Sequence, residues 1–362
     1  MMDGAGLVTV REAIEWKDPL PGTCGFAGVV DGQPVRDVLG RYPLFADGDA
    51  VSRDPTDLDD PSPVPAGTVD GERIWTLPDP DPYEDVGRAT AALVSAIEDV
   101  TPAVAGKTAV AFSGGVDSAV TAALVDGPLY VVGFEGSHDR EAARSAATLL
   151  DRELREIEPT HEDLKRAVPQ VARAIGRTNA MDVSIALPLF LVAERAAANG
   201  VDVLALGQGV DELFGGYAKV AKAPSDPRVE AETVAGARRE VLETLPSQAE
   251  RDVLAVRAGG VEPIAPLLHD RIVAEALRVP GEALVGADGT RKLAFRRAAR
   301  EFVPADLADR DKKAMQYGSL ISRELDRLAR QAGFKRRMDD HVTKYVEHLI
   351  AESSGEDPDA VT

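Results

Sequence analysis

Residues 109–118 place two glycines, two hydroxyl groups and a carboxylate directly after an apolar run. The segment reads Ala-Val-Ala-Phe-Ser-Gly-Gly-Val-Asp-Ser, which predicts a strand, a tight turn and the start of a helix. Backbone N–H groups at a helix start favour an anion, and paired glycines let a phosphate approach the backbone closely. Ser113 and Ser118 can donate hydrogen bonds to that phosphate, and Asp117 can bind a magnesium ion against it. We therefore interpret the segment as a phosphate-binding loop rather than a plain strand-to-helix turn.

A second segment, at residues 204–217, follows another apolar run and reads Leu-Ala-Leu-Gly-Gln-Gly-Val-Asp-Glu-Leu-Phe-Gly-Gly-Tyr. Ligands of α/β proteins bind at the carboxyl ends of the strands, so two such loops can face each other. Asp211 would then be a second magnesium ligand, and together with Asp117 it would hold one Mg²⁺ and a pyrophosphate group. The alternative is that the acidic pair caps a helix N-terminus, which we favour for Glu212 but not for Asp211.

The elements that position these loops alternate in type. Apolar runs predict strands at residues 108–112, 129–134 and 201–206, and a further strand is predicted at residues 153–157. Helical periodicity predicts helices at residues 84–100, 116–125, 138–150 and 182–199. Further helices are predicted after Asp211, at residues 228–245, 270–278, 291–301, 319–332 and 334–351. Alternating apolar strands and helices predict an α/β fold, with a parallel sheet covered by helices on both faces and a helical C-terminal part.

Residues 1–83 differ in composition from the rest of the chain. Residues 1–83 are rich in proline, glycine and aspartate and carry short apolar runs, which predicts a small β-rich module. Residues 54–71 are expected to be extended and exposed. The run Pro-Asp-Pro-Asp-Pro at 78–82 predicts a linker, because proline blocks both helix and sheet ladders. We therefore expect two domains, at residues 1–83 and 84–362.

The composition limits the class of protein. The chain has 362 residues and a net charge of −20, with 41 basic and 61 acidic residues. A lysine-poor, acidic surface suits a halophilic protein and disfavours nucleic acid as a partner. The single cysteine, Cys24, excludes a disulfide framework and multi-thiolate metal sites. Because we see neither a membrane-length apolar run nor a signal peptide, we expect a cytoplasmic location and no membrane partner.

The two loops resemble those of a known group of enzymes. Residues 113–118 are similar to the pyrophosphate-binding loop of the N-type ATP pyrophosphatases (the PP-loop group), which cleave ATP between its α and β phosphates. Residues 207–217 closely resemble the Gly-(Glu)-Gly-x-Asp-Glu-Leu-Phe-Gly-Gly-Tyr motif of the asparagine synthetase C-terminal (synthetase) domain. Further likeness to that domain occurs at residues 260–268, 292–298 and 310–318. The resemblance spans residues 85 to about 320 and implies an adenine nucleotide α-hydrolase-like fold.

Carried over by position, the resemblance implies a role for individual residues. It implies pyrophosphate contacts by Ser113, Gly114, Gly115, Asp117 and Ser118. It implies an adenosine pocket lined by Ala111, Val132 and Gly207. Asp117 and Asp211 would bind magnesium, and Lys292 would contact the nucleotide. Lys312 would be a catalytic cation that stabilises charge on the phosphates as an acyl-adenylate forms and breaks.

Two positions depart from the family pattern. Asparagine synthetases usually carry Glu where this chain has Gln208, and glutamine cannot accept a proton from an attacking ammonium. For this catalytic step, either Glu262 supplies the carboxylate or ammonia arrives already neutral. The family's Pro-Phe-Leu-Asp reads Pro-Leu-Leu-His at residues 266–269, where we interpret His269 as structural.

The first 83 residues resemble pieces of the class II glutaminase of glutamine-dependent members, whose nucleophile is an N-terminal cysteine. Residues 23–28 are similar to its start, and residues 36–45 to a segment that lies far downstream of that cysteine. Only twelve positions separate Cys24 from Arg36. Cys24 also has no free α-amine unless residues 1–23 are removed. We therefore expect a truncated remnant without glutaminase activity, in which Cys24 is a small buried residue.

These features predict an ATP-dependent, AMP-forming ligase of the asparagine synthetase type. A carboxylate, by default aspartate, would be activated as acyl-AMP, and ammonia, free or from a separate protein, would attack it. ATP and Mg²⁺ are the implied cofactors. One alternative is a PP-loop enzyme that adenylates another acceptor such as a tRNA base, which the acidic composition disfavours. The other is a non-catalytic ATP-binding protein, which the retained Asp117, Asp211 and Lys312 disfavour.

Overall fold

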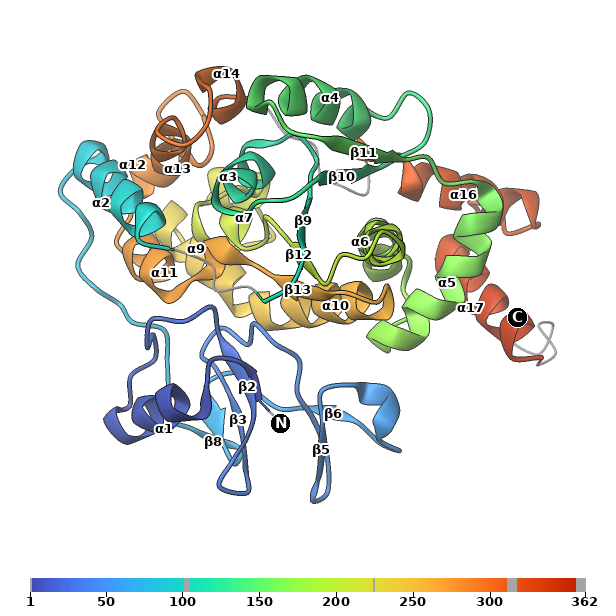
Figure 1. Cartoon of the computed structure of the whole chain (residues 1–362), viewed down its shortest axis with the longest axis horizontal. Helices are drawn as coiled ribbons and strands as arrows, with labels where there is room; N and C mark the ends of the chain where they lie inside the picture. Colours follow the sequence, from blue (N-terminus) through green and yellow to red (C-terminus); the bar gives the residue numbers. More distant parts are fainter. Residues whose placement is uncertain (1, 101–104, 224, 311–317, 356–362) are drawn as a thin grey trace.

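A five-stranded parallel sheet lies at the centre of the larger part of the molecule (Figure 1). The computed structural model describes residues 2–100, 105–223, 225–310 and 318–355. The sheet consists of β9 (Thr108–Ala111), β10 (Leu129–Val132), β11 (Leu154–Ile157), β12 (Val203–Ala205) and β13 (Glu262–Ile264). Its strand order is β11-β10-β9-β12-β13. The strands β9, β10, β11 and β12 confirm the four strands predicted from the sequence, whereas β13 was not predicted.

Helices cover both faces of this sheet, as the sequence predicts. The helices nearest to it are α3 (Val116–Leu124), α4 (His138–Leu150), α5 (His161–Ile175) and α6 (Ala180–Ala198). Side chains of one strand point alternately to opposite faces. Val110 and Val131 accordingly belong to the hydrophobic cluster that contains residues of α3 and α4, whereas Ala109 and Val132 belong to the one built with α5 and α6.

Helices also dominate the remainder of the chain after residue 85. They are α2 (Val86–Glu98), α7 (Val210–Leu213), α8 (Ala218–Ala221), α9 (Val234–Glu243), α10 (Leu245–Ala258), α11 (Asp270–Leu277), α12 (Gly281–Leu284), α13 (Leu293–Ala299), α14 (Ala305–Ala308), α16 (Ile321–Gln331) and α17 (His341–Ser354). The predicted helix at 228–245 is shorter than expected, since α9 covers only residues 234–243 and α10 begins after Thr244. The predicted helix at 334–351 starts only at His341, and α5 and α10 were missed.

The N-terminal module is β-rich, as expected. Its strands are β1 (Met2–Gly4), β2 (Phe26–Val30), β3 (Gln33–Arg36), β4 (Phe45–Asp47), β5 (Ala50–Ser52), β6 (Ser62–Pro63), β7 (Thr68–Val69) and β8 (Glu72–Arg73). They form one sheet of order β1-β2-β3-β7-β8 and one of order β5-β4-β6. The helix α1 (Leu7–Trp16) was not predicted. The expectation that residues 54–71 are exposed is wrong in part, because Thr68 and Val69 are buried where β7 pairs with β3.

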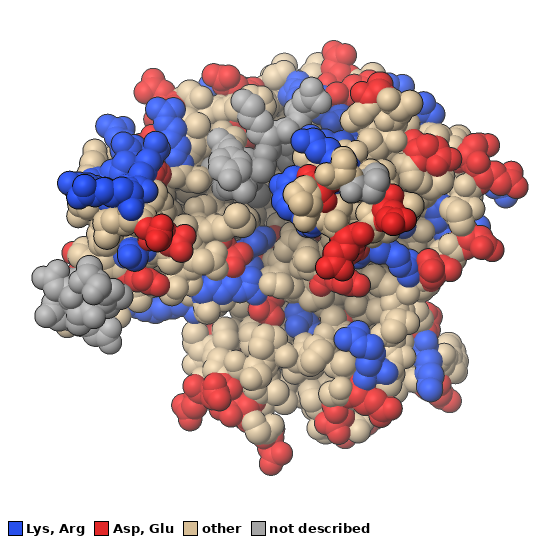
Figure 2. Space-filling view, turned by 180° about the vertical axis from the view of Figure 1, so that it is seen from behind, with Lys and Arg blue, Asp and Glu red and all other residues tan. Residues whose placement is uncertain are grey.

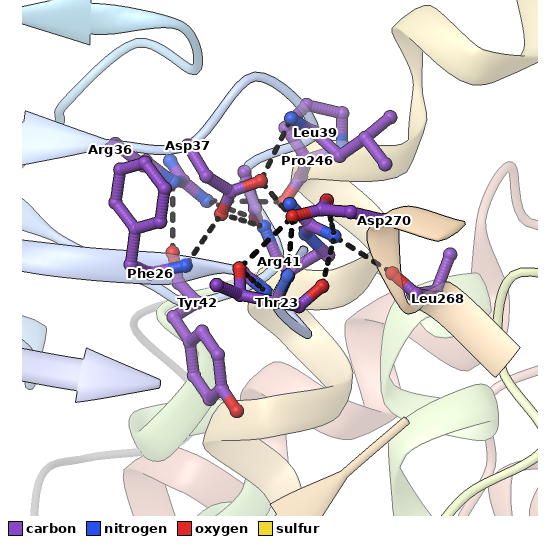
Figure 3. A network of polar contacts seen from close by, with 12 residues as sticks. Thr23, Phe26, Arg36, Asp37, Leu39, Arg41, Tyr42, Pro246, Leu268 and Asp270 are labelled. Atoms are coloured by element: carbon purple, nitrogen blue, oxygen red, sulfur yellow. Dashed lines mark hydrogen bonds and ion pairs between the residues drawn. The ribbon is translucent and has the colours of Figure 1, made fainter. Parts of the chain in front are cut away.

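A buried arginine fastens this module to the larger part of the molecule (Figure 3). The side chain of Arg41 is 2% exposed and donates to Asp37 at 2.9 Å and to Asp270, the first residue of α11, at 2.7 Å. It also donates to the carbonyl oxygen of Leu268 at 2.8 Å. Asp270 in turn accepts from the backbone N–H of Thr23 at 2.7 Å. In the opposite direction, the backbone N–H of Asp270 donates to the carbonyl oxygen of Thr23 at 2.8 Å.

Apolar packing continues across the same interface. Phe26 and Trp75 of the module contact each other edge to face, with ring centroids 5.5 Å apart. Both belong to the hydrophobic cluster that contains Ala89 and Leu93 of α2. Residues 78–82 between the two parts form neither helix nor strand.

Charge is unevenly distributed over the surface. Figure 2 shows acidic side chains at the outer end of the N-terminal module, at the bottom of the view, and a group of basic ones on the flank that carries α16. Arg323, Arg327 and Arg330 of α16 line a hollow in the surface. Among the described helices, none has the length and apolar composition needed to cross a membrane.

Candidate active site

The two loops predicted to bind phosphate and metal lie side by side. Strand order reverses at β9, because β10 pairs with one of its edges and β12 with the other. Open α/β sheets bind ligands beyond the carboxyl ends of the strands at such a reversal. The loops that follow β9 and β12 touch there: a Cβ added to Gly207 would lie 3.1 Å from the carbonyl carbon of Asp117 and from the backbone nitrogen of Ser118.

The first loop is shaped to present backbone N–H groups. Gly114 has φ +74°, and a Cβ there would lie 2.5 Å from the backbone of Ala142 in α4, so this position requires glycine. Gly115 is the N-cap of α3 and offers no side-chain cap. By contrast, side chains cap the first turns of α2, α4, α5 and α6. The start of α3 is therefore the kind of helix N-terminus that binds phosphate.

A buried lysine joins the two predicted metal ligands. The Nζ atom of Lys292 lies 2.8 Å from both carboxylate oxygens of Asp117 and 2.5 Å from Oδ1 of Asp211. The Lys292 and Asp117 side chains are 5% and 2% exposed, whereas Asp211 is 29% exposed. One cation thus lies between a carboxylate from each loop, which confirms that the loops converge.

These carboxylates fit a magnesium ion that is bound partly by substrate. Among the described residues, no group of three or more His, Cys, Asp or Glu side chains could hold a metal on its own. Magnesium is usually held by one or two carboxylates together with phosphates and water. Asp117 and Asp211 provide that number and already bracket a positive charge, so they suit Mg²⁺ bound with a nucleotide's phosphates.

A pocket opens beside the first loop, and both predicted loops contribute residues to it. The predicted residues that line it are Ala111, Ser113, Asp117, Ser118, Val132, Gly207 and Gln208. The residues not predicted are Phe112, Tyr130, Val131, Asp139, Pro188, Leu189, Val192 and Leu206. An apolar wall from α6 and β10 therefore faces the polar loop, as an adenosine group requires.

Comparison with known proteins agrees with this geometry. The family model described as asparagine synthase matches residues 92–245 and 225–359. The chain belongs to the asparagine synthase family. It is 30% identical over 282 residues to a Methanocaldococcus jannaschii protein named "Putative asparagine synthetase 1 (glutamine-hydrolyzing)", covering 68% of this chain and 52% of that protein. It is 29% identical over 190 residues to the glutamine-hydrolyzing asparagine synthetase B of Escherichia coli, covering 52% and 34%. The chain thus spans about half the length, or less, of these relatives.

A second pocket adjoins the first in this asparagine synthase family member. It shares Gly207 and Gln208 with the first, and α10 contributes Arg251 and Asp252 to it. The other residues that line it are Ile185, Gly209, Asp211, Glu212, Tyr217, Leu245, Gln248, Ala249 and Leu268. Burial, together with the Asp211 carboxylate, raises the pKa of Glu212. The Tyr217 hydroxyl donates a hydrogen bond to Glu212.

One of the predicted catalytic residues, Glu262, does not join this arrangement. Glu262 is the first residue of β13, at the opposite end of the strand from the two loops. Its side chain is 60% exposed and pairs with Arg257 at 3.0 Å, so the structure places it away from the first pocket. Lys312 lies outside the described residues. His269 accepts a hydrogen bond from the Arg271 backbone at the start of α11, in agreement with a structural role.

Residues that the sequence interpretation missed come chiefly from α10 and α6. Arg251 and Asp252 are buried, but they belong to a helix that was not predicted. Their signal was an adjacent pair of opposite charges followed at once by the apolar run at 253–256, which is unusual for an exposed turn. Pro188, Leu189 and Val192 belong to a helix that was predicted, although only its packing and not its contact with the pocket could be read from the sequence.

Cys24 lies in a third cavity, between the N-terminal module and the larger part, which Gln208 and Asp252 also line. The thiol is half-buried, and burial raises its pKa to about 11. We predict that iodoacetamide modifies Cys24 at pH 8 about 100-fold more slowly than it modifies an unhindered thiol, because only the thiolate reacts. The rate should rise with pH up to about 11, as followed by mass spectrometry. Modification at the rate of a free thiol would contradict this expectation.

Gly216 lies against the carboxylate pair. A Cβ at this position would overlap Oδ1 of Asp211 and lie 2.5 Å from Cε of Lys292. We expect Gly216→Ala to push Asp211 away from Lys292 and to weaken Mg·ATP binding at least about tenfold in calorimetric titrations. Gly281→Ala is the matched control, since its added methyl would meet only ordinary contacts at 3.7 Å or more and should leave binding unchanged. Equal affinities of both variants would contradict the prediction.

Proposed function

We propose that this protein is an ATP-dependent, AMP-forming ligase that joins a carboxylate to ammonia through an acyl-adenylate. The observation that supports it best is the meeting of Asp117, Asp211 and Lys292 beside a pocket that residues of both loops line. The names of the relatives favour aspartate as the carboxylate. Ammonia is the proposed nitrogen donor, either free in solution or supplied by a separate protein.

In this proposal each loop has a distinct task. The N–H groups at the start of α3, with Ser113 and Ser118, bind the pyrophosphate group that departs. Asp117 and Asp211 hold Mg²⁺, which neutralises charge on the phosphates when it is bound. Lys292 pairs with both carboxylates and so holds the two loops next to each other. Lys312 remains the proposed cation beside the reacting phosphate, because a fixed positive charge there stabilises the transition state.

ATP–pyrophosphate exchange tests the proposal most directly. Each candidate carboxylate, with aspartate first, is incubated with Mg·ATP and labelled pyrophosphate, at low and at high salt. We expect label to enter ATP only when a suitable carboxylate is present, and AMP to accumulate with product once ammonium is added. ATP binding without exchange for any carboxylate tried would count against a ligase and favour a non-catalytic ATP-binding protein.

We also propose that the N-terminal module does not hydrolyse glutamine. β1 pairs with β2 along the sheet edge, so the residues before Cys24 belong to the folded module. The high pKa of the Cys24 thiol disfavours a nucleophile. Glutamine in place of ammonium is therefore expected to yield no amide product, whereas Cys24→Ser should leave the ammonium-dependent reaction unchanged.

A further inference from the structure

The family position that usually carries a glutamate is Gln208 in this chain, and the structure shows what its amide contacts. The Nε2 atom of Gln208 donates to Oδ2 of Asp252 at 2.5 Å. Asp252 belongs to α10, and its side chain is 6% exposed. A carboxylate that came from the 207–212 loop in the family pattern is thus replaced by an amide with a carboxylate directly behind it.

The surroundings hold this carboxylate in one orientation. Oδ1 of Asp252 accepts from Nε of Arg251 at 2.8 Å, and Arg251 also donates to Asp182 at 3.0 Å. The two oxygens of Asp252 therefore have different partners, Arg251 on one side and Gln208 on the other. Each carboxylate oxygen has two lone pairs, so both can still accept a proton or a further hydrogen bond.

The pocket around Asp252 suits a small cation. Asp252 and Asp211 both line the second pocket, and Gln208 lines it and the nucleotide pocket alike. Arg251, the cationic residue that lines it, is already paired with two carboxylates. An ammonium ion in this pocket would therefore meet the carboxylates of Asp252 and Asp211 next to the position where the acyl-adenylate would form.

We propose that Asp252, positioned by Gln208 and Arg251, is the carboxylate that binds the ammonium ion and accepts its proton. This inference rests on the proposed ligase function. One N–H proton of ammonium passes to Asp252, and the freed lone pair forms a bond to the carbonyl carbon of the acyl-adenylate. The bond between that carbon and the phosphate oxygen breaks, AMP leaves with the electron pair, and a second N–H proton passes to water. General-base catalysis of this kind contributes about 10²–10⁴-fold.

The test separates adenylation from amide formation. In Asp252→Asn the side chain keeps its volume and one acceptor oxygen but cannot take up the proton. We expect ATP–pyrophosphate exchange within about threefold of the unsubstituted protein and ammonium-dependent amide formation reduced at least about 100-fold. Hydroxylamine, which is largely unprotonated at neutral pH, should be used with a much smaller loss. Asp99→Asn, which changes an exposed carboxylate that pairs with Arg271 outside this network, is the control and should change neither reaction more than about twofold.

Two further results decide whether Asp252 accepts the proton. Returning a carboxylate to the loop, as Gln208→Glu together with Asp252→Asn, should restore at least about a tenth of the ammonium-dependent rate. Full amide formation in Asp252→Asn would overturn the proposal, and so would equal losses with ammonium and hydroxylamine or a parallel loss of exchange. Absence of exchange in the unsubstituted protein is a different result, because it contradicts the ligase function itself.

Discussion

Replacing Arg41 with methionine is expected to lower the free energy of unfolding by about 3–5 kcal/mol. Arg41 pairs with Asp37 and Asp270, whose side chains are 0% and 1% exposed. Without the guanidinium, two carboxylates would stay buried with no cation, and the carbonyl oxygen of Leu268 would lose its donor. Breaking a buried ion pair from one side is costly because water cannot reach the charge left behind. Urea unfolding followed by circular dichroism measures the change.

The control for this variant is an ion pair of the same kind on the surface. Arg11 pairs with Asp31 in the same module, but their side chains are 55% and 64% exposed. Arg11→Met should therefore leave the unfolding midpoint unchanged, since water solvates the carboxylate that remains. If Arg41→Met loses less than about 1 kcal/mol, the network in Figure 3 does not hold the two parts of the molecule together.

Replacing Asp117 with asparagine is expected to reduce ATP–pyrophosphate exchange at least about 100-fold. Asp117 is 2% exposed, contacts Lys292 and lies on the first turn of α3, within the pocket proposed for the nucleotide. The substitution removes a charged oxygen ligand where the phosphates and their metal would bind, a loss comparable to removing one preorganised group from a transition-state site. The rate of exchange with the preferred carboxylate is the measurement.

Two controls show whether this loss is local. Asp99→Asn changes a carboxylate that is 55% exposed and pairs with Arg271 on the surface, so its exchange rate should be unchanged. The unfolding midpoint of Asp117→Asn should fall only slightly, because Lys292 retains Asp211 as a partner. A variant with normal exchange would rule out Asp117 as a ligand and, with it, the metal site proposed between the two loops.

The sequence predicted the central sheet well because three of its strands, β9, β10 and β12, lie in apolar runs between helices. β13 was missed because Glu262, Pro263 and Ile264 form a three-residue strand with a proline and an exposed carboxylate. α10 was missed because Glu250, Arg251 and Asp252 are charged although they are buried. Such residues are stabilised by partners on other elements, which periodicity along one segment cannot reveal.

For the candidate site, the sequence indicated both loops but not what joins them. Lys292 and Asp117 are 175 positions apart, and only the fold brings Nζ to the carboxylate. The substitution of Gln208 for the family's glutamate was visible in the sequence, and the two expected forms of compensation were the Glu262 carboxylate or ammonia that arrives already neutral. The structure instead shows Asp252 in contact with Gln208, because α10 passes beside the loop. Which residue could compensate for a substitution such as Gln208 depends on contacts in space between residues that are remote in sequence.

The Arg41 network has a practical consequence for anyone who wants to study the ATP-binding part by itself. A fragment starting at residue 84 would retain Asp270, but without the arginine that neutralises it. It would also expose to water the apolar side chains of α2 that share a cluster with Phe26 and Trp75. Such a fragment should express mainly as insoluble material, and coexpression of residues 1–83 as a separate polypeptide should rescue it.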